Sequence, residues 1–330
     1  MPDPIQNPKS KIQNCVVVGC GVIGLTSAIR LQEAGVETTI LTRERAKDTT
    51  SAVAAAVWYP YKAYPEDRVL PWGRRTLEIL YDLARDPDTG CSITTLIELF
   101  DHPEPDPWWI DAVEVFRRSS VKELKPGFID GFTIEVPLIE TPVHLRYLEH
   151  RFERGGGKIE VVPGGLDGLA PLYAEGRLIV NCTGLGAVGL VGDGAMTPIR
   201  GQIVRVSNPG LRHCLVEENN PDAMTYIIPR THDCILGGTA LEDDWSLEPD
   251  AAVTERILRS ACDLEPRLRE ARILEVLVGL RPGRPEVRLE RETVAPGCAV
   301  IHNYGHGGSG YTLGWGCADE VVALAQSWQG

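Results

Sequence analysis

The sequence of 330 residues lacks several patterns that would have placed it in a class at once. No apolar run reaches the roughly 18–20 residues that a membrane span requires, so we expect no membrane partner. The nine cysteines include no CxxC pair, which argues against a structural zinc site or a dithiol redox motif, and we predict no metal site. Basic residues are too few to balance the acids, and a net charge of -13 argues against nucleic acid as a partner.

What is present describes an ordinary globular protein. Hydrophobic residues make up 43% of the chain and charged residues 24%, and the length suits one large domain or two intimate ones. Because the cysteines are scattered and odd in number, and no secretory signal opens the chain, we expect mostly reduced thiols and a cytoplasmic location. One disulfide is compatible with this pattern. The oligomeric state is not readable, and a homodimer is one of the open states.

A strand, a glycine-rich turn and a helix follow one another near the N-terminus. An apolar run over residues 14–18 leads into Gly19-Cys20-Gly21-Val22-Ile23-Gly24. Apolar residues at helical spacing come next, and residues 36–42 then alternate as a second strand. In such a unit the three glycines allow, in order, a tight turn, close approach of a pyrophosphate, and packing of the helix on the strand. The pattern predicts a dinucleotide-binding, Rossmann-like unit.

The residues at the end of the second strand do not identify which nucleotide the chain binds. A carboxylate that binds the ribose is expected about 20 residues after the glycines, and Thr42-Arg43-Glu44 stands there. Glu44 could bind the ribose hydroxyls and Arg43 could stack on adenine, but an arginine here also suits a 2′-phosphate. The motif alone therefore does not separate FAD, NAD and NADP.

Hydroxyl side chains gather just beyond, at Thr49, Thr50 and Ser51, before a run of small residues. One interpretation is a helix start with Thr or Ser as its N-cap. We favour another, in which these hydroxyls and the nearby backbone bind the pyrophosphate and the small residues let a flat ring lie against the chain.

A change of composition indicates a second domain interleaved with the first. Residues 65–142 are rich in Pro, Trp and acidic residues and lack an alternating strand–helix rhythm. Strands separated by turns at 202–206, 225–228 and 234–236 fit an antiparallel sheet. We predict an α/β fold in which a Rossmann-like nucleotide domain (residues 1–58, 143–197 and 284–330) accepts an inserted substrate-binding domain with a mixed or antiparallel sheet (residues 59–142 and 198–283).

A second glycine-rich loop, residues 305–310, lies near the C-terminus. A buried-strand pattern precedes it and a helical pattern, from about Thr312 to Gln326, follows. A helix that starts behind such a loop offers unpaired N–H groups and the positive end of its dipole. This arrangement suits a group that gains negative charge during a reaction.

Taken together, these segments resemble the D-amino-acid oxidase family over about residues 15–326. The resemblance is most specific in four segments that occur in the family's order: Thr49-Thr50-Ser51 through Trp58, Tyr226-Ile227-Ile228-Pro229, Gly279-Leu280-Arg281-Pro282-Gly283-Arg284-Pro285, and His302-Asn303-Tyr304-Gly305-His306-Gly307-Gly308. It implies bound FAD in the nucleotide domain. It also implies hydride transfer from the Cα of a D-amino acid to flavin N5, with O2 reduced to hydrogen peroxide. The imino acid would hydrolyse to a 2-oxo acid and ammonia, a step of D-amino acid catabolism.

The resemblance also implies roles for individual residues. Arg281 would bind the substrate carboxylate with its guanidinium, Tyr226 would add a second donor, and the Gly308 carbonyl would accept from the amine. Val57, Tyr59 and Tyr61 would line the pocket and suit apolar or aromatic side chains. No side chain need act as acid or base, and we interpret His302 and His306 as hydrogen-bonding residues of the loop. We interpret Arg284 and Arg288 as members of structural pairs.

The predicted cofactor-binding residues come from five segments that converge in the family's fold. They are Gly19, Gly21, Val22, Ile23, Gly24, Arg43, Glu44, Thr49, Thr50, Ser51, Ala56, Val57, Cys182, Thr183, Gly184, Arg281, Gly307, Gly308, Ser309, Gly310, Tyr311 and Thr312. The helix that contains Thr312 would direct its N-terminus at the N1–C2=O edge of the flavin, and the Thr312 hydroxyl could bond that carbonyl.

Two departures from the family pattern leave the substrate open. A lid tyrosine of some members is replaced by Asp222, and a pocket tyrosine of others by Ala240. D-aspartate oxidases resemble this chain but place an arginine at the Ala240 position, so its absence favours neutral D-amino acids. Arg230, nearby, keeps D-aspartate open, and a related oxidase of glycine or sarcosine would use the same carboxylate clamp. An NAD(P)-dependent dehydrogenase and a non-catalytic nucleotide-binding protein are the more distant alternatives.

Overall fold

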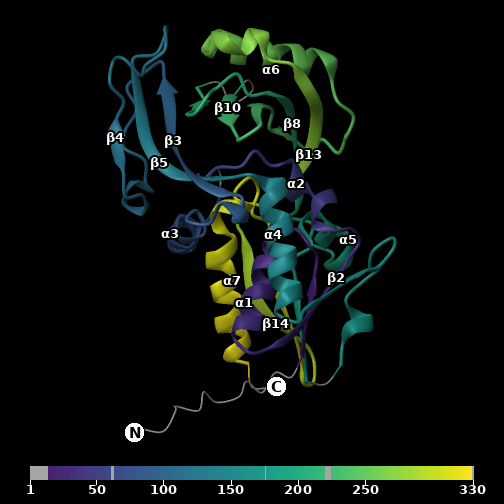
Figure 1. Cartoon of the computed structure of the whole chain (residues 1–330). Coiled ribbons are helices and arrows are strands. Elements are labelled where there is room, and N and C mark those ends of the chain that lie inside the picture. Colours follow the sequence, from purple (N-terminus) through teal and green to yellow (C-terminus); the bar gives the residue numbers. More distant parts are fainter. Residues whose placement is uncertain (1–13, 61–62, 175, 220–223, 329–330) are drawn as a thin grey trace, which may run out of the picture.

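The computed structural model describes residues 14–60, 63–174, 176–219 and 224–328. The strands of these residues form two sheets, one of six strands and one of nine, with helices packed on both (Figure 1). Within the described residues, no helix has the combination of length and apolarity that crossing a membrane would take.

The six-stranded sheet has the order β14-β15-β7-β1-β2-β6. Five neighbouring strands run parallel, and β14 pairs antiparallel with β15 at one edge. The strands are β1 (Asn14–Val18), β2 (Glu37–Thr42), β6 (Lys158–Val161), β7 (Arg177–Asn181), β14 (Arg288–Ala295) and β15 (Cys298–Tyr304). Every residue of β15 is buried, because the sheet is covered on both faces, and a fully apolar run is what such a position selects.

Three helices from distant parts of the chain lie together on this sheet (Figure 1). They are α1 (Val22–Glu33), α4 (Thr141–Arg154) and α7 (Gly310–Gln326). The first buries Leu25, Ala28 and Leu31 on its inner side, which is the spacing that placed a helix here in the sequence. A further helix, α3 (Glu66–Leu83), packs against α7.

The nine-stranded sheet is antiparallel except where β3 and β9 run parallel, so it is a mixed sheet. Its strands are β3 (Cys91–Phe100), β4 (Phe116–Arg118), β5 (Asp130–Ile139), β8 (Thr197–Ser207), β9 (Cys214–Glu217), β10 (Thr225–Pro229), β11 (Asp233–Gly237), β12 (Leu241–Glu242) and β13 (Ile273–Gly283). Helix α6 (Ala251–Leu264) closes the face that buries Val204, Leu215 and Ile227. The other face turns its apolar side chains towards the core shared with α1 and α7.

The remaining helices are short: α2 (Thr50–Val53), α5 (Ala187–Val191), and the 3₁₀ turns η1 (Ala46–Asp48), η2 (Pro87–Thr89), η3 (Ile110–Ala112), η4 (Ala170–Leu172), η5 (Gly184–Gly186) and η6 (Pro266–Glu270). All nine cysteines are free thiols.

Backbone hydrogen bonds join segments of the six-stranded part to the ends of two strands of the nine-stranded sheet, β5 and β13. Residues 56–58 run beside the end of β5, where Trp58 N–H donates to Pro137 O at 2.9 Å and Ile139 N–H donates to Ala56 O at 2.9 Å. At the far end of β13, Gly307 N–H donates to Pro282 O at 2.9 Å. The second contact fastens the C-terminal glycine loop to the strand that carries Arg281.

Most expected elements are confirmed, and several strands are additions. The parallel strands at 14–18 and 178–181, the helix of residues 143–154 and the helix of 250–264 are present with small shifts of their ends. Strands β3, β4, β9, β12, β13 and β14 were not expected from the sequence. Sheet membership fits the interleaved division into two domains, whose boundaries stay predictions.

Close packing of α7 on α3 depends on a missing side chain. A Cβ at Gly316 would lie 2.2 Å from the Trp72 carbonyl oxygen, which belongs to the backbone of α3. We expect Gly316→Ala to lower the free energy of unfolding by about 1–3 kcal/mol, because the helices must separate. Urea unfolding measures the loss, and Gly189→Ala in α5, where a Cβ meets nothing within 4 Å, is the matched control. Equal stability of the two variants would contradict this packing.

Candidate functional site

The carboxyl ends of the parallel strands β1, β2, β7 and β15 meet at one edge of the six-stranded sheet, and the predicted loops follow them. Gly19 has a φ of 108°, and a Cβ there would lie 2.6 Å from the Cys182 carbonyl oxygen. A Cβ at Gly24 would lie 2.0 Å from Gly19 O. Both positions therefore exclude a side chain, which is why the turn can bring the start of α1 so close to β7.

Two helix N-termini open at this edge, and in neither does the residue at the N-cap position cap the helix with its own side chain. Neither Gly21 before α1 nor Ser309 before α7 makes a side-chain capping bond, and neither helix has an acidic residue in its first turn. In α7 the first helical bond runs from Leu313 N–H to Ser309 O. The preceding amides of Gly310, Tyr311 and Thr312 point out of the helix end, where they favour an anion.

The hydroxyl cluster contacts the first glycine turn, and Thr49 does not cap α2 with its side chain, while its binding of the pyrophosphate stays a prediction. Helix α2 begins at Thr50, but Thr49 makes no side-chain capping bond, because its hydroxyl donates to Ala46 O at 2.7 Å. Ser51 Oγ instead accepts from Val22 N–H at 3.0 Å. The Tyr311 hydroxyl donates to Ser51 O at 2.9 Å, so this side chain positions Ser51 and only the backbone of Tyr311 remains for a ligand.

Arg281 and Tyr226 lie flat on the nine-stranded sheet, and two glycines make room for them. A Cβ at Gly237 would lie 1.9 Å from Tyr226 Cζ, and a Cβ at Gly201 would lie 2.5 Å from Arg281 Nη1. Arg281 Nη1 donates to Thr239 O at 2.8 Å, and its guanidinium is hydrogen-bonded to the Tyr226 hydroxyl. Burial raises the pKa of Tyr226, with Arg281 opposing, so the phenol keeps its proton at neutral pH.

The glycine loop lies beside this pair. Since Gly307 N–H is bonded to Pro282 O, the loop follows the residue next to Arg281, and a Cβ at Gly184 would lie 3.5 Å from the Pro282 ring. Gly308 is exposed, whereas its neighbour Ser309 is fully buried. The structure thus brings together Arg281, Tyr226 and the glycine loop, which are well separated in the sequence.

Tyr59 connects the start of α7 to the nine-stranded sheet. Its N–H donates to Thr312 Oγ1 at 3.2 Å, and its carbonyl accepts from the same hydroxyl at 2.8 Å. The Thr312 hydroxyl is thus bonded to Tyr59 here, and the bond expected from it to the flavin carbonyl stays a prediction. Thr312 can still offer its backbone N–H. Val57 forms a bridge to Leu138 and lies partly exposed beside Tyr59.

Comparison with known proteins decides the family. The FAD dependent oxidoreductase family (DAO) matches residues 14–324. The chain belongs to this family. A D-amino-acid oxidase of Rubrobacter xylanophilus is 51% identical over 95% of this chain and 96% of its own length, and a D-aspartate oxidase of Homo sapiens is 35% identical over 93% of each. A glycine oxidase structure from Geobacillus kaustophilus, 18% identical, has a TM-score of 0.77 over 96% of this chain and 95% of that one, which supports the fold.

FAD is therefore the cofactor, and the choice among three nucleotides that the glycine motif left open is settled. The edge described above fits it. The N-termini of α1 and α7 can hold its diphosphate and the edge of its flavin, and the glycines at 19, 21 and 24 leave the close approach that a pyrophosphate needs. The NAD(P)-dependent alternative is wrong.

Two predicted nucleotide-binding side chains lie at the outer end of β2. Arg43 is two-thirds exposed and pairs with Glu44 at 3.0 Å.

On the opposite side of the glycine turn, the Cys182 thiol is buried beside Ser27, and burial raises its pKa to about 12. Cys182 thus shapes the turn through its backbone and Cβ, and its thiol stays protonated.

Glu98 is a residue of this site that the sequence did not reveal. It lies in β3 and is 4% exposed, and both carboxyl oxygens lie 2.9 Å from the Tyr59 hydroxyl. Burial, assisted by the charge of Glu218 and opposed by the bond from Tyr59, raises the pKa of Glu98 to about 8. The available signal was a single glutamate within the apolar run Leu96 to Phe100, which we had not interpreted as a strand.

The two histidines of the glycine loop are buried, and neither is set up as a base. His306 is 2% exposed, and burial lowers its pKa to about 3. His302 contacts Asn181 at 3.4 Å and Glu292 at 3.2 Å, and burial lowers its pKa as well. The hydrogen-bonding role holds for His302, whereas His306 Nε2 has no hydrogen-bond partner among the described residues.

The other arginines near the site are held by carboxylates. Arg284 pairs with Asp193 at 3.2 Å, and Arg288 pairs with Glu290 at 2.7 Å, so both structural pairs are confirmed. Arg230 is 6% exposed and is bound by both oxygens of Asp233, at 2.6 and 2.8 Å. It is therefore engaged and does not offer a free cation to a second substrate carboxylate. Tyr61 and Asp222 lie outside the described residues.

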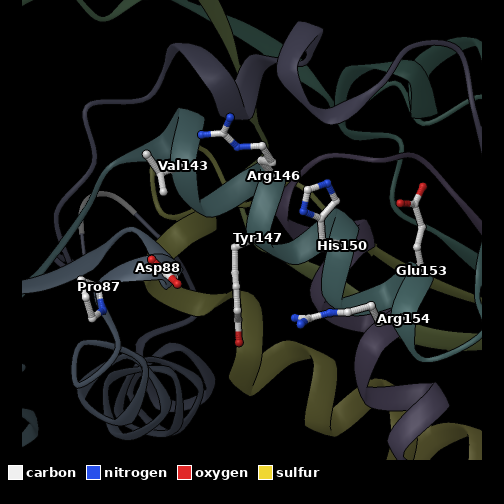
Figure 2. Close-up of a pocket in the computed structure, with 8 residues that line it drawn as sticks. All are labelled: Pro87, Asp88, Val143, Arg146, Tyr147, His150, Glu153 and Arg154. Carbon is white, nitrogen blue, oxygen red and sulfur yellow. The ribbon is translucent and has the colours of Figure 1, made fainter.

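A separate surface groove of about 650 Å³ lies on the outer side of α4 (Figure 2). Tyr147 and His150 of α4 line it together with Asp88 of η2. None of the predicted site residues lines it.

Glu98 makes stability depend on pH. Between its ordinary pKa of 4.5 and about 8, the unfolded carboxyl has lost its proton while the folded one keeps it, so stability falls as the pH rises. The cost at pH 8.5 is on the order of 4 kcal/mol. We expect Glu98→Gln to gain stability over the parent chain at pH 8.5 and much less at pH 5, as measured by urea unfolding. Glu255→Gln, at an exposed position of α6, is the control. A gain that is the same at both pH values would contradict the assignment.

Proposed function

We propose that this chain oxidises D-amino acids with O2, forming an imino acid that hydrolyses to a 2-oxo acid and ammonia, together with hydrogen peroxide. The observation that carries the proposal is the pair of Arg281 and Tyr226, laid flat on two glycines, with the glycine loop bonded to Pro282 beside Arg281 and Gly308 exposed. A planar guanidinium with a neutral phenol beside it is a fitting receptor for a carboxylate.

Each of these groups has one task. Arg281 binds the substrate carboxylate through two parallel N–H donors, and Tyr226, which keeps its proton, donates a third hydrogen bond. The Gly308 carbonyl accepts from the substrate amine. Because the carboxylate and the amine are both fixed, only one enantiomer can direct its Cα–H at the cofactor.

When bound, FAD supplies the two-electron acceptor that takes hydride from Cα and passes the electrons to O2. The chain holds it with the amides at the start of α1 and of α7, and the positive end of the α7 dipole favours negative charge that develops there. His306 stays neutral because its pKa is lowered to about 3, so the residues of this site bind and orient the substrate and none needs to abstract a proton.

The choice among substrates rests on three observations. The relative from Rubrobacter xylanophilus, named D-amino-acid oxidase, is 51% identical, compared with 35% for the human D-aspartate oxidase. Position 240 is an alanine and Arg230 is bound by Asp233, so we find no second carboxylate clamp among the described residues. These observations favour neutral D-amino acids over D-aspartate. Nine free cysteines suit the cytoplasm, where we propose that the enzyme works.

The test is an anaerobic titration of the purified, yellow protein. D-alanine should bleach the visible flavin band and L-alanine should not, and air should restore the colour while peroxide appears. Bleaching by glycine or sarcosine without bleaching by D-alanine would replace the proposal with a glycine or sarcosine oxidase. Retention of the band with every amine would overturn catalysis and favour a non-catalytic flavin-binding protein.

Arg281→Leu tests the clamp. Removing one partner of a buried charge pair costs about 2–5 kcal/mol, so we expect kcat/KM for D-alanine to fall at least about 30-fold while the flavin stays bound. The flavin spectrum and steady-state rates measure the two effects. Arg205→Leu is the control, since it removes an arginine of the same sheet that pairs with Glu275 at 3.0 Å. Near-normal turnover by Arg281→Leu would contradict the assignment.

A further inference from the structure

Tyr59 lies between the nine-stranded sheet and the start of α7. Its backbone holds the Thr312 hydroxyl from two sides, because the N–H of Tyr59 donates to Thr312 Oγ1 at 3.2 Å and its carbonyl accepts from the same hydroxyl at 2.8 Å. The preceding residue, Trp58, is fixed to Pro137 of β5 by a backbone bond of 2.9 Å. Tyr59 therefore connects a strand of the sheet to the helix end that favours an anion.

The side chain of Tyr59 is fixed at its far end by Glu98. Both carboxyl oxygens of Glu98 lie 2.9 Å from the Tyr59 hydroxyl, and the Tyr59 ring packs edge-on against Trp109 with 5.4 Å between the ring centroids. A tyrosine side chain reaches about 6 Å from Cα to its oxygen, so the carboxyl group lies on the order of 10 Å from the Thr312 hydroxyl. One residue thus separates a buried carboxyl group from the start of α7.

Among the described residues, no lysine or arginine forms an ion pair with Glu98. In the register of the sheet, Glu98 of β3 lies opposite Phe132 of β5 and Val216 of β9, which are both apolar. The same row continues to Arg118 of β4. Arg118 stacks on the Phe132 ring at 4.6 Å and pairs with two aspartates, so its charge is already engaged.

The charged groups that act on Glu98 are acidic. They are Glu218, which follows β9, and Glu104, which follows β3. Burial first, and then these two charges, raise the pKa of Glu98, and with the bond from Tyr59 opposing them the result is about 8. The carboxyl group is therefore neutral at pH 7 and ionises in mildly alkaline solution. Once ionised, it carries a negative charge near the start of α7 that no cation of its row neutralises.

We propose that Glu98 is a positioning residue of the FAD site, which holds Tyr59 and with it the start of α7, and whose ionisation opposes reduction of the cofactor. The inference deepens the proposed function and rests on it, because FAD must lie at the start of α7. Reduction brings two electrons to FAD, and the positive end of the α7 dipole favours the negative charge that develops there. A negative charge on Glu98 repels it.

The size of the effect follows from Coulomb's law. At the effective dielectric constant of a protein, two charges roughly 12 Å apart change an equilibrium about tenfold. Because the coupling is reciprocal, reduction also favours protonation of Glu98. In the pH range where Glu98 titrates, it takes up one additional proton from water as FAD gains its two electrons. For a two-electron couple, a tenfold change corresponds to about 30 mV.

The midpoint potential of bound FAD, followed from about pH 6.5 to 10, tests the charge. We expect the potential of the parent protein to fall about tenfold in equilibrium terms, or about 30 mV, further than that of Glu98→Gln, because the amide cannot ionise. The titration of the flavin itself is common to both proteins. Glu255→Gln, at an exposed position of α6, should follow the parent. Profiles of the parent and Glu98→Gln that stay within about twofold, or about 9 mV, would overturn the inference.

The affinity for FAD at pH 7 tests the positioning. Glu98→Gln keeps an acceptor for the Tyr59 hydroxyl, whereas Glu98→Leu removes it. We expect the Kd for FAD to rise at least about fivefold in Glu98→Leu and in Tyr59→Phe, and to stay within about twofold of the parent in Glu98→Gln. Since both changes break one bond, the double variant should bind FAD no more weakly than Tyr59→Phe alone. Additive losses would overturn the role. If Glu98→Leu does not fold, the potential of Glu98→Gln still decides.

The outcomes distinguish this inference from the proposed function, because neither measurement involves an amino acid. If D-alanine bleaches the flavin while the potentials of the parent and Glu98→Gln run parallel, the role of Glu98 is wrong and the proposed function stands. If no amine bleaches the flavin, the proposed function fails, and the two pH profiles still decide the role of Glu98.

Discussion

One hydrogen bond, from Gly307 N–H to Pro282 O, holds the two halves of the site together. It joins the loop after an inner strand of one sheet to the end of a strand of the other, and so fixes Gly308 beside Arg281. The fold supplies many interactions between its two sheets, but this one connects the residues that would bind amine and carboxylate. Selectivity for one enantiomer depends on the distance between the groups that would bind the amine and the carboxylate. The backbone bond from Gly307 to Pro282 fixes how the loop that carries Gly308 lies relative to the strand that carries Arg281.

Absent side chains do as much for the site as those that are present. Tyr226 and Arg281 can lie flat because Gly237 and Gly201 have no Cβ, and α1 can approach β7 because Gly19 and Gly24 have none. A flat guanidinium offers both of its donors in one plane, which is what a carboxylate requires. Glycine in a strand normally weakens the strand, so these positions give up local stability for the shape of the receptor.

The sequence was sufficient for the parts of the fold with strong local patterns. The glycine turn at 19–24 and the apolar strand at 178–181 could be predicted because each carries its own periodicity and punctuation. Strand β3 could not, since Glu98 interrupts its apolar run and its pairing with β9 is made 118 residues away. The bond between the Thr312 hydroxyl and Tyr59 could not be predicted for a similar reason, because the two residues lie 253 positions apart. Arg281 and Tyr226 were found through a family motif, and their contact through a glycine floor became visible only in three dimensions.

The position of β15 has a consequence for how the protein is made. This strand, residues 298–304, lies between β14 and β7 in the six-stranded sheet, and α7, which follows it, packs on α1. Until the ribosome has released these residues, β7 presents an unpaired apolar edge, and α1 lacks its cover. An exposed edge of this kind invites pairing with other chains. The edge of β7 therefore stays unpaired from the synthesis of β7 until that of β15, the last strand of the described chain, which completes both the sheet and the site.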